Sequence, residues 1–334
     1  MASTLVTNIQ IPEIYLPYEY KQITEKSKFF RGGIITPDPL ISNGLNGGGN
    51  SFNVPCRIIN TDDATAIQSG TTLASSAGSS AKTVVRRFLF GKVWGEEELA
   101  SALAGSRPEW EIPELTGQYW GNQYETALVR CSQGIFADNI SSDSNDLVND
   151  IANADGSLAT DANKISSDAI IDTSMLMTDR IDAFEGGGIA MRSEVYTRLL
   201  KLDKIDFVPI SGQAYKIPTY QTMTVVVDNS LPAVAAGTGY DYWTILFEKN
   251  SVGWGEGGYS YITGMETNRV ALDSEDQLIM RKQYGFRFKG FSWAASETVA
   301  NETPLYTEMD DAVNWDRVQD DARTSGMALL VTSG

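Results

Sequence analysis

The segment of residues 61–83 restricts most strongly how this 334-residue chain can fold. Of its 23 residues, 17 are Ala, Ser, Thr or Gly, so it offers almost nothing to a hydrophobic core. Runs rich in branched and aromatic residues flank it at Ser51–Asn60 and Thr83–Trp94 and predict strands. An isolated two-stranded ribbon is marginal in water, and structureless connections beyond about 12–15 residues are uncommon. The pattern therefore predicts a projecting β-ribbon that is either mobile or held by another surface.

Arginines cluster at the base of this predicted ribbon, at Arg57, Arg86 and Arg87, whereas the chain as a whole is acidic. It has 26 Lys and Arg against 43 Asp and Glu, a formal net charge of −17, and the net charge is −2 over residues 1–130, −8 over 131–230 and −7 over 231–334. Opposite charge favours docking of the ribbon base on another copy of the chain. The same balance disfavours direct DNA binding, which needs clustered Lys and Arg on the phosphates.

The first 50 residues predict an extended arm. Four prolines and six glycines are spread over them, a density that neither a helix nor a central strand tolerates. The arm also carries apolar residues, Tyr15 and Tyr18 among them, and is too apolar for a free tail. We expect it to pack either on its own body or on a neighbouring molecule.

The centre of the chain predicts one long helix beginning near Pro108. Apolar residues from Ile112 to Ile135 recur at steps near 3.6, and an unbroken helix over Glu109–Phe136 would be about 42 Å long. Further helices are predicted at Gly95–Gly105, Ser166–Ala183 and Arg192–Lys201. Strands are predicted within Lys216–Asp228, at Tyr242–Phe247, around Leu278–Arg281 and at Tyr284–Phe291. No tandem βαβ pattern dominates, so the predicted fold class is α+β.

The residue inventory argues against most enzyme mechanisms. Histidine is absent, which removes Ser-His-Asp and Cys-His triads and His-ligated zinc. Cys56 and Cys131 have no metal-ligand spacing and are interpreted as free or buried thiols. No cofactor and no metal is expected. No apolar run approaches 18 residues, so neither a signal peptide nor a membrane span is expected.

Four patterns resemble functional motifs but fit structural explanations better. Ser79–Lys82 matches S-x-x-K inside a low-complexity loop without its partner motifs. The acid-rich residues 138–165 lack the EF-hand frame and predict a solvated linker. Residues 253–259 are glycine-rich without being a phosphate loop and predict a mobile loop. Three acidic pairs are interpreted as solvated faces, because adjacency in sequence does not create the opposed carboxylates of a glycosidase: Asp62–Asp63, Asp310–Asp311 and Asp320–Asp321.

Taken in order, several short segments resemble the major capsid proteins of tailed bacteriophages over nearly the whole chain. The segments are Asn53–Pro55, Trp94–Pro108, Tyr119–Ala137, Ile189–Leu200, Ile217–Tyr220 with Val225–Asp228, and Asn314–Val318. The resemblance implies a fold with an N-terminal arm, an extended β-hairpin loop, a peripheral domain with a long spine helix, and an axial domain. The implied boundaries are 1–50 for the arm, 51–94 for the extended loop, 95–165 and 265–292 for the peripheral domain, 166–264 for the axial domain, and 293–334 for a C-terminal segment returning to the axial domain.

The resemblance also implies a function, which is self-assembly into an icosahedral shell that encloses double-stranded DNA. The implied partners are other copies of the chain, in hexamers and pentamers, with a separate scaffolding protein, a portal and a decoration protein. DNA would be enclosed without specific binding, no membrane would be involved, and the virion capsid would form in the host bacterial cytoplasm. The candidate inter-subunit contacts are Arg57, Arg86, Arg87, Phe88, Phe90, Tyr15, Tyr18 and Trp254.

Two other functions stay open at this point. An encapsulin-like compartment would have the same fold but would contain a cargo enzyme instead of a genome. A carboxylate-based carbohydrate-active enzyme would be a monomer. We expect the chain not to be an enzyme.

Overall fold

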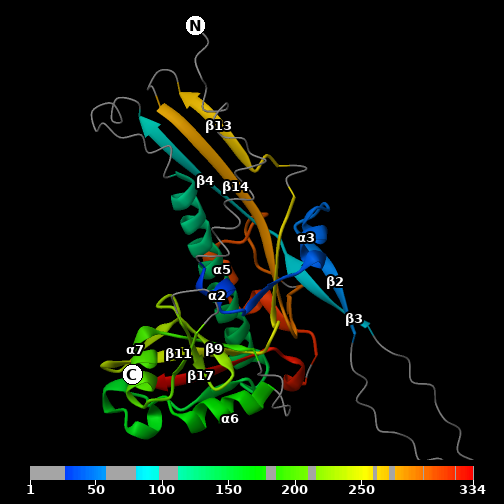
Figure 1. The fold of residues 1–334 in the computed structure, drawn as a ribbon. Coiled ribbons are helices and arrows are strands. Elements are labelled where there is room, and N and C mark those ends of the chain that lie inside the picture. Colours follow the sequence, from blue (N-terminus) through cyan, green and yellow to red (C-terminus); the bar gives the residue numbers. More distant parts are fainter. Residues whose placement is uncertain are drawn as a thin grey trace, which may run out of the picture.

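The computed structural model describes residues 27–57, 80–97, 112–177, 186–209, 216–258, 262–270, 275–295, 297–319 and 321–333. Helices and strands are mixed along these residues, which confirms the predicted α+β class. Two sheets organise the molecule, a long one that extends away from the body and an eight-stranded one at the opposite end (Figure 1). No helix among the described residues is both long and apolar enough to cross a membrane.

The long sheet is built on strand β14, which spans 14 residues. One edge of β14 pairs with β4, and its other edge pairs first with β13 and then with β12, which in turn pairs with β1. Figure 1 shows β4, β13 and β14 running together away from the rest of the molecule, with helix α5 alongside. The strands are β1 (Ile35–Pro37), β4 (Phe88–Glu97), β12 (Val252–Glu256), β13 (Met265–Val270) and β14 (Glu275–Phe288).

The prediction of two separate strands around Leu278–Arg281 and Tyr284–Phe291 was wrong. Lys282 and Gln283 interrupt the apolar pattern, yet β14 continues through them and buries both side chains. Lys282 Nζ pairs with Glu256 Oε1 at 3.1 Å, and Gln283 Nε2 donates to the Leu45 carbonyl at 2.6 Å. Buried polar groups are tolerated when they are partnered in this way.

The mobile loop predicted at residues 253–259 was also wrong for the part that the structure describes. Residues Val252–Glu256 form β12, and the side chain of Trp254 lies in the core. The glycines have a packing reason, because helix α3 lies directly on the strand. A Cβ on Gly255 would lie 2.6 Å from the Ser42 backbone nitrogen and 2.8 Å from the Ile41 side chain.

Helix α5 (Ile112–Ser142) confirms the predicted long helix and extends it six residues past Phe136. Its glycines do not interrupt it, and Gly134 provides room for the Trp315 ring and the Met309 carbonyl. The helix predicted at Gly95–Gly105 was wrong at its start, because residues 95–97 continue β4, and residues 98–105 lie outside the described residues. The apolar stripe of α5 is buried at Trp120, Tyr124, Leu128, Cys131 and Ile135.

The eight-stranded sheet has the order β5-β17-β11-β6-β9-β8-β7, and β10 also pairs with β11. All seven residues of β17 are buried, between parallel β5 and antiparallel β11. Helices α6 (Ser167–Met177) and α7 (Ser193–Lys201) accompany this sheet (Figure 1). Its strands are β5 (Val148–Asp150), β6 (Gly188–Met191), β7 (Asp206–Pro209), β8 (Lys216–Tyr220), β9 (Met223–Val227), β10 (Ala233–Ala236), β11 (Gly239–Phe247) and β17 (Met327–Ser333).

The first described residues correct the prediction of a purely extended arm. They form helix α2 (Lys28–Arg31), strand β1 and helix α3 (Pro39–Leu45). Proline is compatible with α3 because Pro39 is its first residue, where no intrahelical N–H is required, and the Asp38 side chain accepts from the Leu40 N–H. The remaining elements are β2 (Ser51–Arg57), β3 (Ser80–Arg86), β15 (Phe291–Trp293), β16 (Trp315–Arg317), α8 (Tyr306–Met309) and short 3-10 helices at Gly156–Leu158, Asp161–Asn163, Ala312–Asn314 and Ala322–Thr324.

Candidate assembly site at the base of the ribbon

Strands β2 and β3 form an antiparallel ribbon in which Ser51 pairs with Arg86 and Arg57 with Ser80. One face of the ribbon is apolar, and its Val54 and Val85 side chains are buried. They pack with Ile41 and Leu45 of α3, and the half-buried Phe52 joins them. This set, which we call the ribbon core, is separate from the main core of the molecule. The ribbon therefore has its own small apolar support.

The chain changes partners at Arg87, the residue between β3 and β4. Before it, β3 pairs with β2 of the ribbon, and after it, β4 pairs with β14 of the long sheet. The Arg87 backbone N–H donates to the Asn50 carbonyl at 2.9 Å. Its guanidinium donates to the carbonyl oxygens of Leu45 and Gly47 at the end of α3. Arg87 thus fastens the junction to α3.

Arg86 fastens the other side of the ribbon to the body. Its side chain is only 5% exposed. Nη1 pairs with Glu297 Oε1 at 2.9 Å, and Nη2 donates to the Glu302 carbonyl at 3.2 Å. Nearby, the Val84 N–H donates to Ser292 Oγ of β15 at 2.9 Å. The base of the ribbon is therefore held by apolar contacts on its α3 side, and on its β15 side by polar contacts together with packing of Val84 against the main core.

A second anchoring point joins the start of the described chain to α5. The buried Glu125 carboxylate accepts from Ser27 Oγ at 2.8 Å and from the Lys28 N–H at 2.5 Å. Burial raises the pKa of Glu125 above its usual value, although both hydrogen bonds act in the opposite direction. Lys28 Nζ also lies 3.8 Å from the Asp228 carboxylate at the end of β9.

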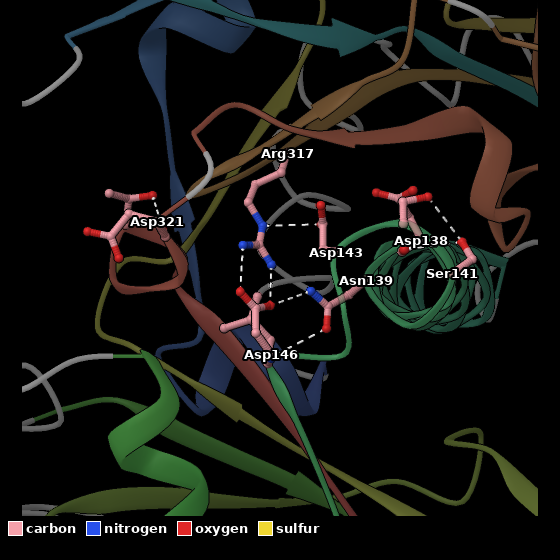
Figure 2. Close-up of polar contacts among 10 residues, drawn as sticks. Asp138, Asn139, Ser141, Asp143, Asp146, Arg317 and Asp321 are labelled. Atoms are coloured by element: carbon pink, nitrogen blue, oxygen red, sulfur yellow. Dashed lines mark hydrogen bonds and ion pairs between the residues drawn. The ribbon is translucent and has the colours of Figure 1, made fainter.

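The solvated linker predicted at residues 138–165 was wrong for its first part, which is an ordered polar cluster at the end of α5 (Figure 2). Arg317 of β16 forms a bidentate pair with Asp146, and its Nε lies 3.2 Å from Asp143. Hydrogen bonds from Arg317 lower the pKa of Asp146, whereas burial raises the pKa of Asp138. Asn139 is fully buried; its side-chain amide donates to the Asp146 carboxylate and accepts from the Leu147 N–H. Asp143 and Asp146 thus fix β16 to the turn that follows α5.

The acidic residues weighed as catalytic have structural partners where the structure describes them. Asp310 pairs with Arg130 at 2.6 Å, while Asp311 and Asp321 accept backbone N–H groups at the start of short 3-10 helices. Asp62, Asp63, Ser79 and Asp320 lie outside the described residues. No group of three potential metal ligands occurs within the described part of the chain.

The chain is similar to phage capsid proteins both in sequence and in structure, although no family model matches it. The "Major capsid protein" of Bacillus phage SPP1 is 29% identical over 325 residues, which cover 96% of this chain and 95% of that protein. The capsid asymmetric unit of cyanophage Pam1 has a TM-score of 0.58 at 10% identity, covering 93% of both chains. The capsid of Ralstonia phage GP4 has a TM-score of 0.57 at 9% identity, covering 92% of both chains.

The chain has the tailed-phage major capsid protein fold. This finding confirms the resemblance drawn from the ordered sequence segments.

Within this capsid fold, the predicted contact residues divide into two groups. Arg86, Phe88 and Trp254 are buried inside the chain, Phe88 and Trp254 in the main core. Arg87 and Phe90 are partly exposed. The Phe90 ring stacks on the Tyr306 ring, with 5.1 Å between the ring centroids. Tyr15 and Tyr18 lie outside the described residues, and for Arg57 only the backbone is described.

Sequence reasoning missed the groups on the body that hold the ribbon. Ser292, Glu297 and the Glu302 carbonyl come more than 200 residues after the ribbon strands that they contact. No spacing signal links them to Arg86. Only the excess of acids in the last third of the chain hinted that a basic residue would find a partner there.

Proposed function

We propose that this chain is a major capsid protein that self-assembles into an icosahedral shell enclosing the double-stranded DNA of a tailed bacteriophage. The observation that carries the proposal is the agreement of two comparisons over almost the whole chain. A named major capsid protein matches in sequence over 96% of the chain, and capsid structures match in fold over 92–93%. A shell subunit needs surfaces for its neighbours and no catalytic centre.

Exposed apolar groups on the eight-stranded sheet support self-association. Phe207 and Val208 of β7 are about half exposed, and β7 is an edge strand whose outer backbone groups face no other strand of the sheet. Tyr240, beside the β10–β11 turn, is 53% exposed. Exposed edge strands and apolar groups of this kind favour pairing with another chain.

Among the predicted contact residues whose side chains the structure describes, Arg87 and Phe90 keep exposed surface, and we assign them to the contact with a neighbouring subunit. We assign residues 51–94 to the extended loop, 95–165 and 265–292 to the peripheral domain, and 166–264 with 293–334 to the axial domain. Residues 1–50 would be the arm. We propose that copies of this chain form the hexamers and pentamers of the shell. The other proposed partners are a scaffolding protein, a portal and a decoration protein. The shell would form in the bacterial cytoplasm and become the virion capsid.

Electron microscopy of the recombinant chain tests the proposal. We expect closed or partly closed shells of uniform curvature, because the fold carries self-association surfaces. A chain that stays monomeric in gel filtration under all assembly conditions would contradict shell formation, and glycosidase activity of that monomer would favour the enzyme alternative. Shells that co-purify with a cargo enzyme would favour an encapsulin-like compartment instead.

A further inference from the structure

We propose that Arg86 is a positioning residue that sets the direction in which the β2–β3 ribbon leaves the body. The sequence alone suggested that Arg86 contacts a neighbouring molecule. The structure instead buries Arg86 and pairs it with Glu297 of the same chain. The proposal deepens the proposed function, because a shell subunit must present its projecting ribbon to its neighbour at a fixed angle.

The support on the body side of Arg86 is connected to the main core. Glu297 Oε2 accepts from the Trp293 indole N–H at 2.5 Å, while Oε1 faces Arg86. The Trp293 ring lies in the main core. Its centroid is 5.0 Å from the centroid of the Trp315 ring and 6.3 Å from that of the Phe88 ring. A chain of contacts therefore runs from the core through Trp293 and Glu297 to the ribbon.

The shape of the guanidinium is essential to this arrangement. Arg86 uses two nitrogens for two acceptors on the segment that follows β15, the Glu297 carboxylate and the Glu302 carbonyl. A planar fork fixes direction as well as distance, whereas the single ammonium of lysine is a point charge on a flexible stem. Arg86→Lys would keep the charge but lose the fixed direction.

The other supports of the ribbon do not define its direction by themselves. The ribbon core contains few side chains and stands apart from the main core. Within the described residues, Arg87 bonds to α3 and to the residues that follow it, so it ties the junction to the same side as the ribbon core. On the opposite side, the body holds the ribbon through Arg86 and through the Val84 N–H to Ser292. Loss of the Arg86 fork leaves that side with one neutral hydrogen bond and the non-directional packing of Val84 against the main core.

A distance distribution between two spin labels on unassembled subunits tests the proposal directly. One label would be placed on Cys56 of β2, and the other on a cysteine introduced by Ile140→Cys at an exposed position of α5. Cys131 is fully buried and would stay unlabelled. For Arg86→Lys we expect the distribution to broaden by about twofold, because the fork geometry is lost. The melting temperature of the body should change little.

Two further variants make the result specific. Glu297→Gln removes the partner charge at a partly exposed side chain, should fold without difficulty, and should broaden the distribution to a smaller extent. Arg130→Lys is the matched control, because Arg130 also pairs with a carboxylate, Asp310, but does not touch the ribbon. It should leave the distribution unchanged. Unchanged widths in both Arg86→Lys and Glu297→Gln would overturn the proposal.

The same variants connect the inference to assembly. If the parent chain forms closed shells, Arg86→Lys should yield open or irregular assemblies, and Arg130→Lys should yield closed ones. Regular closed shells from Arg86→Lys would show that the direction of the ribbon does not depend on Arg86. If the parent forms no shells, the proposed function fails, while the label distances still decide the role of Arg86.

Discussion

The eight-stranded sheet and the β2–β3 ribbon are held in place by different kinds of contact. In the sheet, the seven residues of β17 are buried between two strands, and its five apolar side chains, Met327–Val331, belong to the main core. The ribbon has a small separate core, touches the main core through Val84, and is oriented by directional polar contacts at Arg86 and Val84. Burial of apolar area is non-directional, whereas hydrogen bonds to a guanidinium fix geometry. The contrast indicates that the sheet provides stability and that the ribbon base provides direction.

The largest expected effect is on the sheet side of this comparison. Leu329 of β17 is fully buried and is paired with Val148 and Ile245. Leu329→Ala should lower the free energy of unfolding by about 2–5 kcal/mol, because it removes buried methyl groups and leaves a cavity. Chemical denaturation of the unassembled subunit, followed by circular dichroism, measures this change.

The matched variant on the ribbon side is Val54→Ala, which also truncates a buried side chain. Its direct cost is about 1.6 kcal/mol for two methyl groups. Since the ribbon core is separate, we expect this cost to loosen the ribbon and to leave the main unfolding transition almost unchanged. A main transition shifted as far as in Leu329→Ala would show that the two cores unfold as one unit.

An effect smaller than that of Leu329→Ala is expected where the ribbon support meets the long sheet. A Cβ on Gly255 would press against Ile41 and the Ser42 backbone of α3. Gly255→Ala should therefore displace α3 and cost about 1–3 kcal/mol, as overpacking usually does. Gly48→Ala is the control, because an added Cβ there meets nothing within 4 Å. Equal melting temperatures for the two variants would contradict close packing of α3 on β12.

Local patterns predicted the parts of the fold whose neighbours are close in sequence. The apolar stripe of α5 predicted a long helix, and the runs at Lys216–Asp228 predicted β8, a turn and β9. The resemblance in the order of short segments predicted the overall fold, although no single segment was decisive. These predictions succeeded because helix periodicity and strand alternation are local properties.

The errors arose where a distant residue decides the conformation. The glycines of β12 suggest a loop until α3, more than 200 residues earlier, is placed on them. Lys282 suggests a strand end until Glu256 neutralises it in the interior. Arg86 suggested an intermolecular contact for the same reason, because its partner Glu297 follows 211 residues later. Tertiary pairing of this kind leaves no spacing signal in the sequence.

The smallest expected effect concerns the polar anchor between Ser27 and α5. Glu125 has a raised pKa because it is buried, so the folded state binds its proton more tightly than the unfolded chain. The stability from this group is fully present below the unfolded pKa, near the ordinary value of 4.5, and is lost as the pH rises through the raised value. Glu125→Gln does not titrate and keeps an acceptor oxygen for the Ser27 hydroxyl and the Lys28 N–H. The stability of the parent relative to this variant should therefore fall with rising pH over that interval.

Glu308 gives a control of opposite sign for the same measurement. The N–H groups of Ala300 and Leu305 donate to its carboxylate and lower its pKa, so its contribution is present above the ordinary pKa and is lost as the pH falls. The stability of the parent relative to Glu308→Gln should rise with pH, whereas the difference for Glu125→Gln should fall. Denaturation curves at a series of pH values measure both differences. If both stability differences instead rose with pH, the hydrogen bonds to Glu125 would outweigh its burial, and Ser27 and Lys28 would be anchored by a charge that folding favours.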